Sequence, residues 1–267
     1  MSYADAWLKW SHILEAGAAP LTERMLELGK ARSARAVLDV GTGIGEPGIS
    51  AAQVMEQAGR VLGIDPDPNM IALARNKARE GNVRKIDFEV ANVETINLVG
   101  GSFDLILARW SLMFVSDLAS TITRLCRALK PGGHLVAATW SSPDRVPALS
   151  IAKAAVHRHF GLPGSPHDAV STFSLSGETE ITSLLCEAGF RDITIRPIDV
   201  VYDFASVSEF IQYRLDVAGP LWPGMDAGSS KEVEDAFEAI GSDLKQYKKP
   251  DGTYRLTNNA ICIHCRA

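Results

Sequence analysis

The chain has 267 residues, of which 46% are hydrophobic and 22% are charged. This length is enough to bury a sizeable core in one domain, with room for a small appendage. The formal net charge is -5 at pH 7 and no basic stripe runs along the sequence, which argues against a nucleic-acid partner. No apolar run reaches the length of a membrane span, and residues 1–12 lack the layout of a signal peptide. We therefore expect a cytoplasmic protein.

Strand-like apolar runs alternate with helical patterns between residues 36 and 140, as is typical of a parallel sheet with helices on both faces. The predicted strands cover residues 36–41, 60–65, 85–91, 103–109, 134–140, 191–202 and 260–266. The fold class that follows is α/β, with a doubly wound and mostly parallel sheet of seven strands.

Cap and turn residues place helices between these strands. The predicted helices cover residues 45–59, 67–81, 117–129 and 178–188. Asp67 can cap the second helix, with Pro68 at its first position and Gly81 at its end. After the third helix, Lys-Pro-Gly-Gly at residues 130–133 predicts a turn.

Two segments do not follow the alternation. Residues 1–35 form a helical prefix that contains Trp7 and Trp10, and we expect it to act as a cover. Residues 203–256 stand between the last two strands, where a long segment is commonly a lid or a substrate-recognition insert. The cofactor-binding core is then expected at residues 36–202 and 257–267.

The cysteines do not indicate a metal. Cys262 and Cys265 form a CxxC motif inside the last predicted strand. No second pair of ligands stands at zinc spacing, and no helix follows Cys262 as a redox site would require. We expect both residues to pack as small apolar side chains.

The informative segment is the glycine loop that follows the first strand, and it matches two motifs. Residues 43–48 match G-x-G-x-x-G, the fingerprint of a dinucleotide site. Asp39, Gly41, Gly43 and Gly45 match D-x-G-x-G-x-G, a second glycine-rich pattern. In both motifs the missing Cβ atoms let the backbone approach a ligand at a helix N-terminus.

The register of the strand favours the second motif. A dinucleotide loop places its first glycine where the strand ends, whereas here the strand ends at Gly41, two residues earlier. Asp39 would also repel a pyrophosphate, but it suits an ammonium group. Asp65, which ends the second strand beside this loop, can accept hydrogen bonds from both ribose hydroxyls.

At this point the sequence resembles the class I S-adenosylmethionine-dependent methyltransferases, with their Rossmann-like fold, and in particular the ubiquinone/menaquinone-biosynthesis C-methyltransferase type. The resemblance covers residues 35–138. It rests on "VLDVGTGIG", "GIDPDPNMIALAR", "SFDLILARWSLMFVSD" and "CRALKPGG", in this order and at normal spacing. It implies S-adenosylmethionine as the cofactor.

The resemblance implies a role for each matching residue. Gly41, Gly43 and Gly45 would present backbone to the methionine part of the cofactor. Asp39 would organise the loop near the ammonium group, and Asp65 would hold the ribose. The remaining implied positions are Pro66 and Met70 beside the adenine, although Met70 is equally typical of a helix core, and Arg109 against cofactor or acceptor.

One position departs from the family pattern. The third strand is usually followed by an Asp that accepts a bond from the adenine amino group, and this chain has Asn92 there. Its amide oxygen can still accept, but less strongly than a carboxylate. Val93 would follow with its backbone N–H near the ring.

The acceptor is expected to be a small molecule. Transfer from a sulfonium is an in-line displacement in which alignment is the main task, and no catalytic dyad is evident. Candidate acceptor contacts are Trp10 and His12 in the prefix and Trp110 after the fourth strand. The sequence leaves open the acceptor, the methylated atom and the oligomeric state.

Two other functions remain open at this point. The overlapping G-x-G-x-x-G would suit an NAD(P)-dependent oxidoreductase. A protein that binds S-adenosylmethionine without methylating anything would keep the same glycine loop.

Overall fold

The computed structural model describes residues 2–56, 59–162, 172–221, 225 and 229–267. The chain divides into two compact units, each assembled from three segments. Unit 1 comprises Met1–Ala18, Ser142–Pro166 and Asp199–Asn259, and unit 2 comprises Ala19–Ser141, His167–Ile198 and Ala260–Ala267.

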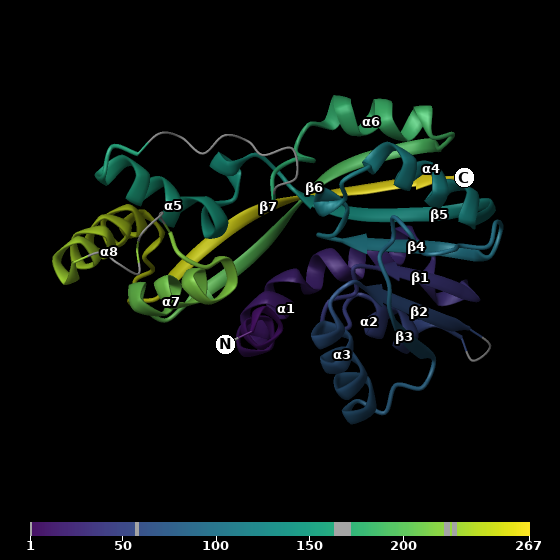
Figure 1. Cartoon of the computed structure of the whole chain (residues 1–267), viewed down its shortest axis with the longest axis horizontal. Helices are drawn as coiled ribbons and strands as arrows, with labels where there is room; N and C mark the ends of the chain where they lie inside the picture. Colours follow the sequence, from purple (N-terminus) through teal and green to yellow (C-terminus); the bar gives the residue numbers. More distant parts are fainter. Residues whose placement is uncertain (1, 57–58, 163–171, 222–224, 226–228) are drawn as a thin grey trace. The chain divides into compact units, whose positions relative to one another are not determined.

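Unit 2 is built on a sheet with the strand order β3-β2-β1-β4-β5-β7-β6, which can be followed by the labels in Figure 1. The strands are β1 (Ala36–Val40), β2 (Arg60–Asp65), β3 (Ile86–Val90), β4 (Phe103–Arg109), β5 (Leu129–Trp140), β6 (Arg191–Phe204) and β7 (Tyr254–Arg266). The pairs β3–β2, β2–β1, β1–β4 and β4–β5 are parallel, whereas β5–β7 is antiparallel. The prediction of a mostly parallel sheet of seven strands is confirmed.

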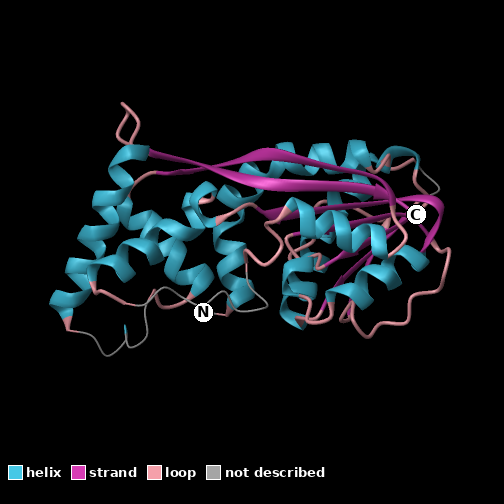
Figure 2. Ribbon diagram, turned by 90° about the horizontal axis from the view of Figure 1, so that it is seen from above, coloured by secondary structure: helices cyan, strands magenta, loops and turns pink. Residues whose placement is uncertain are grey.

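The helices connect these strands, and the main ones are drawn in cyan in Figure 2. They are α1 (Tyr3–Leu28), α2 (Gly48–Val54), α3 (Pro68–Glu80), α4 (Leu118–Ala128), α5 (Pro147–His159), α6 (Glu178–Glu187), α7 (Val207–Ala218) and α8 (Ser230–Leu244). Short 3-10 helices are η1 (Ala31–Ser33), η2 (Leu112–Phe114), η3 (Pro143–Arg145) and η5 (Lys245–Tyr247). Within these described segments, no helix is both long and apolar enough to cross a membrane.

Helices cover both faces of the sheet, as predicted. Alternate strand residues such as Leu38 of β1 and Ile106 of β4 share one apolar core with α4 and α6. Asp39 points to the opposite face, where α2 packs so closely that a Cβ added to Gly48 would lie 2.7 Å from its carboxylate. Successive side chains of a strand point to opposite faces, so one strand anchors both helical layers.

Several predicted boundaries differ from the structure. The helix predicted over 45–59 is shorter in the structure, where α2 covers Gly48–Val54. Pro47, which lacks a backbone N–H, precedes its first residue, and the extended conformation of Met55 ends it. Residues 57–58 lie outside the described part of the chain. The turn predicted at 130–133 lies within β5, where partner residues shift from Phe103↔Leu129 to Leu105↔His134. Proline and glycine there bulge the strand instead of ending it.

Unit 1 contains the first part of α1, helices α5, α7 and α8, the end of β6 and the start of β7. The buried side chain of Asn258 joins three of these elements. Its Oδ1 accepts from the Ala148 N–H at 2.8 Å, and its Nδ2 donates to the carbonyls of Val200 and Leu256 at 3.1 and 3.0 Å. A buried amide with this many bonds fixes the start of α5 against both strands.

Candidate functional site

The glycine loop after β1 supplies an open backbone. Gly41, Gly43 and Gly45 have φ values of 67°, 55° and 111°, which disfavour residues with a Cβ. A Cβ at Gly41 would lie 2.3 Å from Ser111, and one at Gly45 would lie 2.5 Å from Ile49. At Gly43 a Cβ would meet no atom within 4 Å, so bare peptide faces open space there.

The buried side chain of Asp39 binds the glycine loop through hydrogen bonds. Its side chain is 0% exposed, and Oδ2 accepts hydrogen bonds from Thr42 Oγ1 at 2.6 Å and from the Gly48 N–H at 2.8 Å. Burial raises the pKa of Asp39 to about 7, although these two bonds and the charge of Arg109 act in the opposite direction. Full burial suits the predicted role of organising the loop.

Asp65, at the end of β2, is hydrogen-bonded to the glycine loop. Its Oδ2 accepts from the Gly43 N–H at 3.0 Å, and its Oδ1 accepts from the Asp67 N–H at 2.9 Å. Partial burial raises the pKa of Asp65, and the two backbone bonds oppose that shift. A carboxylate has about four lone-pair positions, so each oxygen keeps capacity for a ligand hydroxyl.

The residues predicted beside the adenine surround the ends of β2 and β3. Pro66 is exposed directly after Asp65, and Met70 on α3 is 5% exposed. Asn92 is exposed, and its Oδ1 accepts from the Glu94 N–H at 2.8 Å. Val93 packs its side chain into the apolar core of the sheet. Asn92 therefore shapes the turn after β3 through its own amide oxygen.

Arg109 at the end of β4 links the glycine loop to α1. Its Nη1 donates to Thr22 Oγ1 at 2.6 Å, and its Nη2 donates to the Glu46 carbonyl at 3.4 Å. Its Cζ lies 5.1 Å from the centroid of the Trp110 ring. The guanidinium is thus held beside the loop by α1, by the loop backbone and by the neighbouring Trp110 ring.

Trp110, predicted as an acceptor contact, forms an aromatic pair that the sequence alone does not reveal. Its ring is stacked on that of Trp140, at the end of β5, with a centroid distance of 4.5 Å and an interplanar angle of 12°. Trp110 has a φ of 55°, and its buried Nε1 has no hydrogen-bond partner in the described part of the chain. Trp140 could have been found because carboxyl ends of neighbouring parallel strands meet at one edge.

Trp10 and His12, the other two predicted acceptor contacts, belong to unit 1. Trp10 is 4% exposed and its Nε1 donates to Asp216 Oδ2 at 2.8 Å. His12 is exposed, and its Nδ1 lies 3.2 Å from the Lys9 carbonyl. These contacts give Trp10 a packing role, and acceptor binding by either residue stays a prediction.

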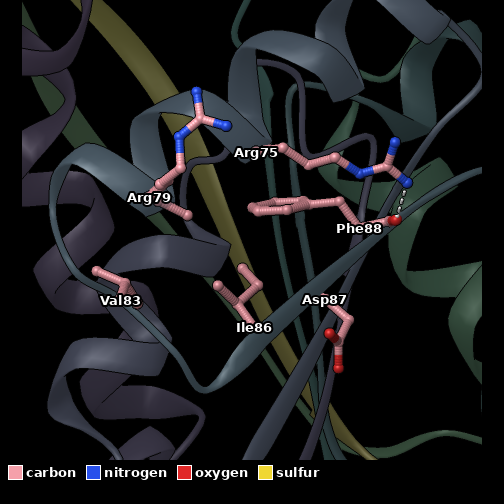
Figure 3. A pocket seen from close by; sticks show the side chains of 7 residues that line it. Arg75, Arg79, Val83, Ile86, Asp87 and Phe88 are labelled. Atoms are coloured by element: carbon pink, nitrogen blue, oxygen red, sulfur yellow. Dashed lines mark hydrogen bonds between the residues drawn. The ribbon is translucent and has the colours of Figure 1, made fainter.

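A hollow of about 360 Å³ lies between α3 and β3 and is shown in Figure 3. Its lining residues are Arg75, Ala78, Arg79, Val83, Ile86, Asp87 and Phe88. These residues include the start of β3, and Arg75 donates to the Phe88 carbonyl at 2.6 Å. Ligands of open α/β sheets bind at the carboxyl ends of the strands, so this hollow is not the predicted cofactor site.

Known proteins match this chain in sequence and in fold. The pattern of a family described as a methyltransferase domain matches residues 31–188, which is more than half of the chain. Aklanonic acid methyltransferase DauC of Streptomyces sp. (strain C5) is 33% identical, over 43% of this chain and 53% of that protein. Ubiquinone biosynthesis O-methyltransferase of Methylobacterium sp. (strain 4-46) is also 33% identical, over 43% of this chain and 45% of that protein.

The alignments reach about half the length of these curated relatives. Among solved structures, the YcgJ protein from Bacillus subtilis superposes with a TM-score of 0.59 at 15% identity, covering 92% of this chain and 97% of that one. A likeness at this identity shows the fold. The predicted resemblance to S-adenosylmethionine-dependent methyltransferases is confirmed, and the comparisons do not favour an oxidoreductase.

Proposed function

Because the chain belongs to the methyltransferase domain family, we propose that it transfers a methyl group from S-adenosylmethionine to a small-molecule acceptor. The observation that carries this proposal is the open backbone at Gly43, flanked by the carboxylate of Asp65. The names of two relatives, which refer to aklanonic acid and to ubiquinone biosynthesis, support an organic small molecule as the acceptor.

The residues of the loop fit the cofactor. The space in front of Gly43, which a Cβ would fill, would receive the methionine part against the peptide backbone. Asp65 would accept the ribose hydroxyls on its remaining lone pairs. Asp39 would act through Thr42 and Gly48, by keeping the loop in its conformation. Pro66, Met70, Asn92 and Val93 would border the adenine.

The main task of this chain in the proposed reaction is to align the methyl group of the cofactor with the acceptor. When bound, S-adenosylmethionine supplies an activated methyl group for in-line displacement. Holding two reactants in the correct geometry can lower a barrier by about 7–11 kcal/mol. Arg109 is held by Thr22 and by the Glu46 carbonyl, so it would keep the methionine end of the loop and the stacked Trp110 in fixed positions. Trp110 would then contact the acceptor.

Calorimetric titration tests cofactor choice. S-adenosylhomocysteine, the product form, should bind saturably, and NADH should not bind. Saturable NADH binding without S-adenosylhomocysteine binding would overturn the proposal in favour of an oxidoreductase.

Transfer of a tritiated methyl group to a metabolite extract tests catalysis. Label should appear in an organic-extractable small molecule with the active protein and be absent with heat-treated protein. If S-adenosylhomocysteine binds but no extract yields labelled product, the chain is a binding protein and not a methyltransferase.

A further inference from the structure

Helix α7 of unit 1 buries a guanidinium group. Arg214 is 7% exposed, and it is the one buried Lys or Arg in the described part of the chain. It lies on the face of α7 that also buries Phe210 and Ile211. A guanidinium is always charged in proteins, so its burial needs compensation by an anion.

That compensation is absent from the described residues. Arg214 Nε has no hydrogen-bond partner among them, and none of their carboxylates lies within ion-pair distance of the guanidinium. The two acids of α7 are engaged elsewhere. Glu209 accepts from the Ala205 N–H, and Asp216 accepts from Lys9, Trp10 and Gln212 at 2.7–2.8 Å.

Arg214 lies beside the ring of Tyr213, which belongs to an aromatic cluster. Its Cζ lies 5.8 Å from the centroid of the Tyr213 ring, and Tyr213 packs in turn against Trp10, Tyr202, Phe204 and Phe210. Burial lowers the pKa of Arg214 and raises that of Tyr213, while their charge interaction and the side-chain hydrogen bond between them oppose both shifts. An aromatic ring attracts a cation more weakly than a carboxylate does, so Tyr213 compensates the charge only in part.

We propose that Arg214 and Tyr213 form a carboxylate-binding site in unit 1. The planar fork of Arg214 would donate two parallel N–H bonds to the two carboxylate oxygens, and the Tyr213 hydroxyl would donate a further one. The ligand class is a small carboxylic acid. The site is argued from unit 1 alone and stands whether or not that acid is the methyl acceptor.

Benzoate and benzamide are suitable probes because they share ring and shape and differ in charge. Benzoate should raise the melting temperature of the wild-type protein in a concentration-dependent manner, and benzamide should not. Arg214→Met removes the buried charge while it keeps an apolar stem, so it should abolish the benzoate effect. Without ligand its melting temperature should equal or exceed that of the wild type, because an uncompensated buried charge destabilises.

A conservative variant separates binding from folding. Arg214→Lys keeps the charge but lacks the bidentate fork, and benzoate should bind it roughly tenfold more weakly. Arg255→Met is the matched control, since Arg255 is an exposed arginine of the same unit that pairs with Asp203; benzoate should stabilise it as it does the wild type. Full benzoate stabilisation of Arg214→Met, or equal stabilisation by benzamide, would overturn the proposal.

Titration with S-adenosylhomocysteine distinguishes failure of the carboxylate-site proposal from failure of the proposed methyltransferase function. The residues proposed for the cofactor lie in unit 2, so Arg214→Met should bind S-adenosylhomocysteine like the wild type. Failure of the wild type to bind S-adenosylhomocysteine would refute the methyltransferase proposal and leave the benzoate result intact.

Discussion

Asp65 meets two backbone N–H groups, one on each carboxylate oxygen, and it has lone pairs left for the ribose. We expect Asp65→Ala to weaken S-adenosylhomocysteine binding by about 1.5–3 kcal/mol, the usual contribution of a hydrogen bond to a charged group. Calorimetry measures this as a drop of roughly 10–150-fold in affinity. Asp87→Ala is the control, because Asp87 is exposed on β3. Unchanged affinity in Asp65→Ala would remove Asp65 from the site.

Substitution of Gly43 gives a second test of the cofactor site, and substitution of Gly101 is its matched control. Both have positive φ values, 55° and 66°, and a Cβ at either would meet no atom within 4 Å. Alanine at either position should therefore cost a similar free energy of unfolding, about 1–2 kcal/mol.

Only Gly43→Ala should impair cofactor binding, because its methyl group would occupy the space proposed for the methionine part. The expected loss is about 1–3 kcal/mol in binding free energy, as in other overpacked sites. Equal S-adenosylhomocysteine affinity in both alanine variants would place the cofactor elsewhere.

Residues of the loop could be predicted from the sequence because their arrangement is local. Asp39 and the three glycines lie within seven residues, and their spacing alone defines the turn. Trp140 and Arg214 were not identified. The stack of Trp110 on Trp140 depends on the pairing of β4 with β5, and the burial of Arg214 depends on distant segments of unit 1.

At the scale of elements, β5 and β7 carry a histidine pair. His134 Nδ1 lies 2.8 Å from His264 Nε2, and the two rings are stacked at 18°. Burial and the charges of His264, Lys30 and Arg266 lower the pKa of His134 to about 4. The pKa of His264 is also lowered, by burial and by the charges of Arg266, Lys30 and Arg24, while the charge of Asp192 opposes this shift.

A lowered histidine pKa means that the folded state favours the neutral ring. The pair therefore contributes stability above pH 6.5, the ordinary value, and this contribution is lost as the pH falls toward 4. His134→Phe keeps a ring that cannot be protonated, so its melting temperature should fall less between pH 7 and pH 4.5. His159→Phe, at an exposed histidine of α5, is the control. An equal fall in all three proteins would contradict this account.

Element types could be predicted from the sequence better than element ends. Asp67 and Pro68 start α3 as expected, with Asp67 Oδ1 accepting from the Asn69 N–H at 2.8 Å. The sequence did not indicate that β7 starts at Tyr254, because the first half of the strand, which belongs to unit 1, lacks the continuous apolar run of its second half. Pairing with neighbouring strands of the sheet extends β7 beyond its apolar run.

At the scale of the whole molecule, each unit combines three separate segments of the chain. The sequence predicts a cover at residues 1–35 and a lid at residues 203–256, and these functions remain proposals. Which distant segments share a core depends on long-range contacts, and the hydrophobic pattern of each segment alone does not encode its partner.

Hydrogen exchange on the intact chain can assign each ligand to its unit. S-adenosylhomocysteine should give its largest protection at residues 41–48 and 65–70 in unit 2. Benzoate should give its largest protection at residues 207–218 in unit 1. Coincident protection maps for the two ligands would contradict the assignment of separate sites.

The parallel indoles of Trp110 and Trp140 also have an optical consequence. At a centroid distance of 4.5 Å their strong indole transitions lie close enough to couple, and this coupling should add an exciton component to the circular dichroism of the protein. A molecule that docks on Trp110 would perturb this exciton signal. The protein thus carries an intrinsic chromophore with which unlabelled candidate acceptors can be screened.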